Sequence, residues 1–157
     1  MIQRIQTVYL SLVAGLFVVL LFLPLVFIHS GDSTYILTLC TVKSISKAVK
    51  VVYLTFPLAI TATVIVILSL IAVFLYGKRK LQRRVCLAVF LLILVFCFLA
   101  GYYYMVAVDK IPEIGRNVMT NPSIWASFPV IAGILSILAI NKINTDEKLI
   151  RSLDRIR

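Results

Sequence analysis

The stretch Lys78-Arg79-Lys80-Leu81-Gln82-Arg83-Arg84 divides the chain and predicts its fold. Five of its seven residues carry positive charge, and an apolar stretch of membrane-spanning length lies on each side of it. A short, strongly basic connection between two such stretches is typical of the cytoplasmic side of a bilayer. We therefore expect the flanking stretches to form an antiparallel pair of transmembrane helices, joined by a basic turn on the cytoplasmic side.

The composition agrees with a chain that resides in a membrane. Of the 157 residues, 62% are hydrophobic and 14% are charged, whereas a soluble domain is about half apolar and about a quarter charged. The net charge is +10, but the cations lie beside apolar blocks and not on a soluble face. We therefore expect anionic lipid headgroups, and not nucleic acid, as their counter-charge.

Four apolar blocks predict an all-α membrane protein, a single domain over residues 1–157 with a bundle of four transmembrane helices. The expected spans are residues 8–28, 53–76, 85–106 and 123–140. At about 1.5 Å per residue, the first span covers about 30 Å, which is enough to cross the hydrocarbon core. In the outer loop that follows it, Tyr35 to Val42 is rich in Thr, Val and Ile, and this composition predicts a short strand.

Residues 142–157 are expected to form a cytoplasmic tail with a C-terminal amphipathic helix. Asn144 and Glu147 have the spacing of a capping box. An apolar stripe follows at helical spacing, and it consists of Leu149, Ile150, Leu153 and Ile156. So short a helix is marginal alone in water, so we expect it to dock on the membrane surface or on a partner.

The distribution of cations predicts the orientation. Four spans place both termini on one side, and with the basic turn inside, the inner segments carry 11 of the 16 cations. This bias favours cytoplasmic termini. Three of the outer cations, Lys43, Lys47 and Lys50, cluster in the first outer loop and argue against this orientation. The five outer cations are Lys43, Lys47, Lys50, Lys110 and Arg116.

Two sets of residues are candidate functional sites. The turn and the tail together predict a basic surface that binds lipid headgroups or a partner, although the same charges also serve as a plain topological anchor. Its residues are Lys78, Arg79, Lys80, Arg83, Arg84, Arg151, Arg155 and Arg157. Small residues at helical spacing predict helix-packing faces in the second and fourth spans. These residues are Ala59, Ala62, Ser69, Pro129, Gly133 and Ser136.

Three prolines lie near the outer ends of their spans. Pro24, Pro57 and Pro129 predict kinks at a common depth, because proline removes a helical hydrogen bond. Such kinks would leave a crevice for lipid or for a partner helix. The alternative is that prolines accumulate near span ends without a role.

The sequence argues against several classes of function. The four predicted spans contain no Asp, Glu, Lys, Arg or His, whereas proton pumps and cation channels usually carry such residues inside the membrane. His29 is the sole histidine, and no nucleophile or carboxylate forms a motif with it. Cys40, Cys86 and Cys97 show no metal-binding spacing. We predict no catalytic site, no metal and no cofactor, and therefore no enzyme.

The two ends of the chain carry a family resemblance. The start, Met1 to Leu10 (MIQRIQTVYL), and the end, Asp146 to Arg157 (DEKLIRSLDRIR), resemble those of an uncharacterised family of small four-span membrane proteins from Bacteroidota. The resemblance implies a bacterial inner membrane and no specific activity. We expect a structural or accessory protein that binds another membrane protein or associates with itself. The alternative is a small transporter or lipid-handling protein.

Overall fold

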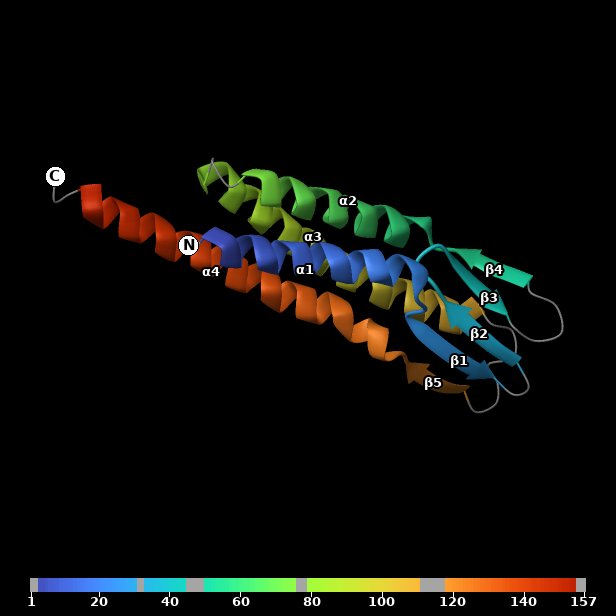
Figure 1. Ribbon diagram of the computed structural model, residues 1–157. Coiled ribbons are helices and arrows are strands. Elements are labelled where there is room, and N and C mark those ends of the chain that lie inside the picture. Colours follow the sequence, from blue (N-terminus) through green and yellow to red (C-terminus); the bar gives the residue numbers. More distant parts are fainter. Residues whose placement is uncertain (1–2, 31–32, 45–49, 76–78, 111–117, 155–157) are drawn as a thin grey trace.

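A computed structural model describes residues 3–30, 33–44, 50–75, 79–110 and 118–154. Figure 1 shows four long helices side by side with a small sheet at one end, and α1 begins and α4 ends at the opposite end. Each helix contains a segment long and apolar enough to cross a membrane. The helices are α1 (Gln3–Phe22), α2 (Phe56–Phe74), α3 (Arg79–Lys110) and α4 (Phe128–Asp154).

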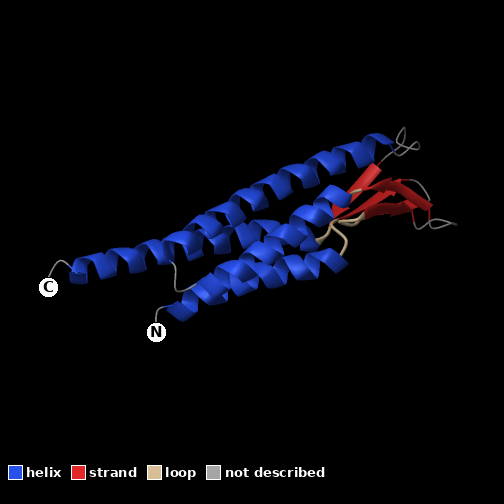
Figure 2. Ribbon diagram, turned by 90° about the horizontal axis from the view of Figure 1, so that it is seen from above, coloured by secondary structure: helices blue, strands red, loops and turns tan. Residues whose placement is uncertain are grey.

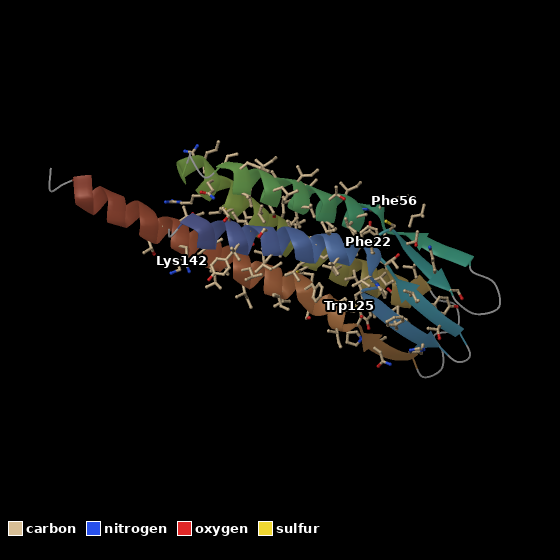
Figure 3. All side chains as sticks on the ribbon, viewed as in Figure 1. Phe22, Phe56, Trp125 and Lys142 are labelled. Carbon is tan, nitrogen blue, oxygen red and sulfur yellow. The ribbon has the colours of Figure 1, made fainter. Side chains whose placement is uncertain are left out.

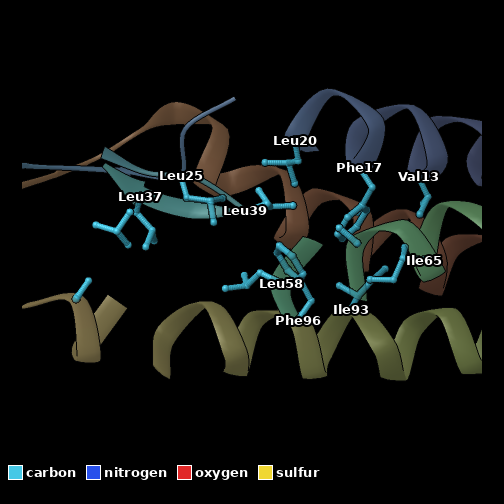
Figure 4. Packing of buried hydrophobic residues seen from close by; sticks show 14 of the residues in the cluster. Val13, Phe17, Leu20, Leu25, Leu37, Leu39, Leu58, Ile65, Ile93 and Phe96 are labelled. Carbon is cyan, nitrogen blue, oxygen red and sulfur yellow. The ribbon is translucent and has the colours of Figure 1, made fainter. Parts of the chain in front are cut away.

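The four helices pack as the corners of a square. Helix α1 contacts α2 and α4, and α3 contacts the same two helices, so α1 and α3 face each other across the diagonal. Phe17 of α1 and Phe96 of α3 are fully buried and meet on this diagonal. Their ring centroids lie 5.2 Å apart in an edge-to-face arrangement. Figure 4 shows both side chains within the hydrophobic cluster. The centre of the bundle is therefore filled by two aromatic rings.

The outer surface of the bundle is as apolar as its interior. Only 22% to 33% of each apolar helix segment is buried. Leu87, Leu91 and Leu94 of α3, for example, are each about half exposed. Such a surface is unfavourable in water, and it therefore requires an apolar surrounding.

The sheet joins the first pair of helices, α1 and α2, to the second pair, α3 and α4. Strands β1 (Val26–Ser30), β2 (Ser33–Leu37), β3 (Thr41–Ser44) and β4 (Lys50–Leu54) lie between α1 and α2. Strand β5 (Val118–Pro122) lies between α3 and α4, yet it pairs with β1, so the order is β4-β3-β2-β1-β5. All pairs are antiparallel. Figure 2 shows the sheet continuing beyond the helix ends.

One face of the sheet is buried. Tyr35, Leu37 and Val42 alternate with more exposed neighbours and share a hydrophobic cluster with Ala107 of α3. Helix α3 has 32 residues, about 48 Å, and Figure 1 shows its end alongside the sheet. The extra length of α3 therefore supports the sheet.

Backbone hydrogen bonds fasten the sheet to the bundle. The amide of Leu25 donates to the carbonyl of Leu37 at 2.8 Å, and the carbonyl of Leu25 accepts from the amide of Ser123 at 3.1 Å. Thr55, fully buried before α2, donates its hydroxyl to the carbonyl of Thr38 at 3.0 Å. Its amide donates to the carbonyl of Cys40 at 2.9 Å. The junction thus satisfies polar groups that burial would otherwise leave costly.

The four predicted spans exist as helices, but their boundaries differ from residues 8–28, 53–76, 85–106 and 123–140. Helix α1 ends at Phe22, because Pro24 disfavours a helical residue before it and lacks an amide donor. Val26 to Ile28, predicted as helix, lie in β1, and Tyr53 lies in β4. Apolar β-branched and aromatic residues suit a buried strand as well as a span.

The predictions of a basic turn and of a separate tail helix are both corrected by the structure. Arg79 to Arg84 form the first turns of α3, since Lys, Arg, Leu and Gln all favour helix. Helix α4 continues without interruption through Asn144 to Asp154, so Asn144 lies inside a helix and caps none. Lys78, Arg155 and Arg157 lie outside the described residues.

The short strand and the proline kinks are also corrected. Residues Tyr35 to Val42, predicted as one strand, span the end of β2, a turn and the start of β3. Pro24 lies between α1 and β1, and Pro57 lies in the first turn of α2. Pro129 is the second residue of α4, after the short 3-10 helix Ile124–Ser127. The prolines therefore mark helix ends and kink no described helix.

Candidate functional site at the basic end of the bundle

The start of α3 presents cations on the same side as exposed apolar residues. Arg83 and Arg84 are exposed, and Leu87 and Leu91, one and two turns further along the same face, are also exposed. The side chain of arginine is long enough to lie along apolar surface while its charge reaches polar headgroups. The exposed arginines thus lie at the end of an exposed apolar stripe on α3.

Two further cations at the start of α3 lie at the positive end of the helix dipole. Arg79 and Lys80 belong to the first turn of α3, which contains no acidic residue. The amino end of a helix carries partial positive charge and is stabilised by anions, so each added cation costs about 0.3–1 kcal/mol at low ionic strength. An anionic group at this end would relieve both the repulsion among the cations and the repulsion from the dipole.

Helix α4 contributes further cations at this end. Lys142 is exposed, and Figure 3 places it far from Phe22 and Trp125, which lie near the sheet. Arg151 lies in the last part of α4, which projects beyond the other helices (Figure 1). Of the predicted basic surface, the described positions lie at the start of α3 and in the last part of α4, and only the side chains of Arg83 and Arg84 are described.

A buried glutamine holds this end together, and the sequence did not single it out. Gln82 is 1% exposed although Arg83 and Arg84, which follow it in the chain, are exposed cations. Its Nε2 donates to the carbonyl of Ala72 at 3.1 Å, close to the end of α2, where carbonyls have no partner within the helix. Cys86 and Val89, four and seven residues further along α3, are also buried. This helical spacing was the signal in the sequence from which the burial of Gln82 could have been predicted.

The predicted helix-packing residues lie at contacts between helices of this chain. Ala62, Ser69 and Ser136 are fully buried. Pro129 is buried, whereas Ala59 and Gly133 are half-buried. A Cβ placed on Gly133 would lie 3.8 Å from Cγ2 of Ile93 in α3. The most buried small residues thus face the interior and do not form the outward surface.

Buried hydroxyls inside the bundle bond to their own helices. Ser69 donates to the carbonyl of Ile65 at 2.7 Å, and Ser136 donates to the carbonyl of Ala132 at 2.9 Å. Side chains of Asp, Glu, Lys and Arg in the described apolar segments occur only near segment ends. Among the residues that the structure describes, no three metal-ligating side chains come together.

The chain belongs to a family described as a domain of unknown function (DUF4293), whose model matches residues 2–156. The match covers nearly the whole chain, and it confirms the expectation of an uncharacterised family. No curated protein matches the sequence.

Proposed function

We propose that this member of the family is an accessory protein of the bacterial inner membrane, with four spans and both termini in the cytoplasm. It binds another membrane protein and conducts no solute. Its basic end lies among the headgroups of the inner leaflet, and its sheet lies outside the cell membrane. A source in Bacteroidota, which the resemblance at the two ends implies, is part of the same proposal.

The filled interior is the observation that carries this proposal. Phe17 and Phe96 close the centre of the bundle. The buried hydroxyls of Ser69 and Ser136 are occupied by their own helices. A conduit for ions or polar solutes needs polar groups that are free to replace water around the solute. The packing therefore supports a binding role over a transport role.

The partner surface is assigned to the basic end. The most buried small residues of α2 and α4 pack within the chain, so they are not available to a partner while the bundle is intact. Arg83, Arg84 and Lys142 are exposed. In the proposed orientation they lie where headgroups and cytoplasmic segments of other proteins are within reach. A partner with acidic residues near the membrane surface fits this charge.

Native mass spectrometry after mild detergent extraction tests the proposal. We expect a stoichiometric complex with a second protein, and we expect its yield to fall in the double variant Arg83→Gln, Arg84→Gln. Lys43→Gln is the matched control, because Lys43 is an exposed cation at the opposite end of the molecule. Recovery of the chain alone with bound lipid would instead favour the lipid-handling alternative.

The orientation has a separate test. Cys40 is exposed at the sheet end, whereas Cys86 and Cys97 lie in the apolar segment of α3. A membrane-impermeant maleimide added to intact spheroplasts should label Cys40, and Cys40→Ser should abolish the labelling. Labelling that appears only after the cells are opened would reverse the proposed orientation.

The alternative function has lost its main support. A small transporter or lipid-handling protein was inferred from a crevice at the level of Pro24, Pro57 and Pro129. These prolines lie at helix ends near the sheet. They therefore provide no kinks from which such a crevice would form.

A further inference from the structure

Amide side chains from three helices gather at the basic end of the bundle. Gln6 of α1 is 6% exposed and Gln82 of α3 is 1% exposed. Asn144 of α4 is half-buried, and its Oδ1 is fully buried. Each of the three lies within one helical turn of a residue of the small hydrophobic cluster at this end. That cluster consists of Leu10, Ala72, Cys86, Ala139 and Ile143.

One polar atom of this group lacks a partner. Among the residues that the structure describes, Oδ1 of Asn144 is the only buried side-chain oxygen or nitrogen without a hydrogen bond. A buried acceptor that has no donor is costly, and native proteins rarely contain one. A hydrogen bond is therefore expected at Asn144.

The register of α3 and α4 indicates which residue lies opposite Asn144. A Cβ placed on Gly133 of α4 would lie 3.8 Å from Cγ2 of Ile93 in α3, so these two positions face each other. The two helices run in opposite directions, because α3 ends and α4 begins near the sheet (Figure 1). Eleven residues, about three helical turns, lead from Ile93 back to Gln82 and from Gly133 on to Asn144.

An intermediate level of the same two helices supports this register. Seven residues from the first contact, the same count reaches Cys86 on α3 and Ile140 on α4. Cys86 is fully buried in the small cluster, and Ile140 packs against that cluster. Gln82 and Asn144 therefore occupy the next turn, on the facing sides of their helices.

The amide of Gln82 is suited to bond with the amide of Asn144. Its Nε2 donates to the carbonyl of Ala72 in α2 at 3.1 Å, and its Oε1 is an acceptor with two lone pairs. Oδ1 of Asn144 cannot donate to this acceptor. A half-turn of the Asn144 amide replaces Oδ1 by Nδ2, which is a donor of nearly the same size.

We propose that Asn144 and Gln82 form a hydrogen-bonded pair of amides that joins α4 to α3 at the basic end. Nδ2 of Asn144 donates to Oε1 of Gln82, and Gln82 in turn donates to Ala72, so one chain of hydrogen bonds crosses three helices. The pair fixes the spacing between Arg84 of α3 and Lys142 of α4, both exposed cations. Asn144 is thus a positioning residue for these cations.

Exchange of side-chain amide hydrogens with water tests the orientation of Asn144. The unmodified chain is labelled with 15N-asparagine and studied by NMR in detergent micelles, and the variant Asn144→Gln identifies the Asn144 signal. We expect its amide to exchange at least about tenfold more slowly than that of exposed Asn141, because a buried hydrogen bond must open first. Exchange as fast as that of Asn141 would overturn the proposal.

Two variants test the partner. In Gln82→Leu, we expect the exchange of Asn144 to approach that of Asn141, and unchanged slow exchange would show that Gln82 is not the acceptor. Asn144→Leu should lower the midpoint of unfolding by sodium dodecyl sulfate, whereas Asn141→Leu is the matched exposed control. A raised midpoint for Asn144→Leu would show that Asn144 has no partner. These measurements use the chain alone, so their failure leaves the accessory function proposed above untouched.

Discussion

Replacing Phe96 by alanine should destabilise the bundle far more than replacing Phe98, two residues away on the same helix. Phe96 is 0% exposed and Phe98 is 78% exposed. Helices that separate within a membrane leave their side chains in lipid, so no transfer to water contributes to either change. The difference therefore measures packing alone.

The magnitude follows from the cavity and from the lost ring contact. A phenylalanine-to-alanine change opens a cavity of about 100 Å³, and at about 24 cal/mol per Å³ this costs about 2.4 kcal/mol. The edge-to-face contact with Phe17 adds about 0.5–1.5 kcal/mol. We expect a loss of about 3 kcal/mol for Phe96→Ala and less than about 0.5 kcal/mol for Phe98→Ala.

Reversible unfolding in mixed micelles, followed by circular dichroism during titration with sodium dodecyl sulfate, provides the assay. A double-mutant cycle with Phe17→Ala should give a coupling energy of about 1 kcal/mol. Equal losses for Phe96→Ala and Phe98→Ala, or strictly additive effects of Phe17→Ala and Phe96→Ala, would refute the placement of the two rings at the centre.

The same unfolding assay tests three further changes. Thr55→Val should cost about 1–2 kcal/mol, because it removes the hydroxyl that donates to the carbonyl of Thr38. Gln82→Leu should cost about 1–2 kcal/mol, because the carbonyl of Ala72 loses the donor that joins α2 to α3. Gly15→Ala should instead stabilise α1 by about 0.5–1 kcal/mol, because a Cβ at this position meets no atom within 4 Å.

Each of these three expectations has a result that would contradict it. Thr63→Val is the control for Thr55, because the Thr63 hydroxyl bonds only to the carbonyl of Ala59 in its own helix. A loss for Thr63→Val as large as that for Thr55→Val would show that the junction is not special. A stable Gln82→Leu variant would remove the proposed bridge, and a destabilised Gly15→Ala variant would indicate a close neighbour on that face.

The sequence predicted the existence of the spans better than their ends. Long apolar runs identify a segment that avoids water, and four such helices are present. The runs do not distinguish a span from an adjoining buried strand, so Val26 to Ile28 were assigned to the wrong element. Pro24 was the local signal for the boundary, whereas the end of α2 inside the predicted span carries no comparable signal.

The sheet could not be predicted in full from the sequence, because it depends on contacts between residues far apart in the chain. Strand β5 pairs with β1, whose Ile28 lies opposite Thr120, although about ninety residues separate them along the chain. The short segment Val118–Pro122 shows no alternation that predicts a strand. Gln82 at the basic end is a similar case, because its burial depends on the carbonyl of Ala72 in another helix.

The pairing of β5 with β1 has a consequence for the order of synthesis. The chain leaves the ribosome from its amino end, so β1 to β4 are made before α3 and β5 exist. Until β5 arrives, β1 is an edge strand with unpaired backbone groups, which is the kind of edge that recruits other chains. The strand that closes this edge is made immediately before the last helix. The complete five-stranded sheet, with β1 paired on both sides, therefore forms only when the chain is nearly complete, and a truncated product leaves β1 as an edge strand.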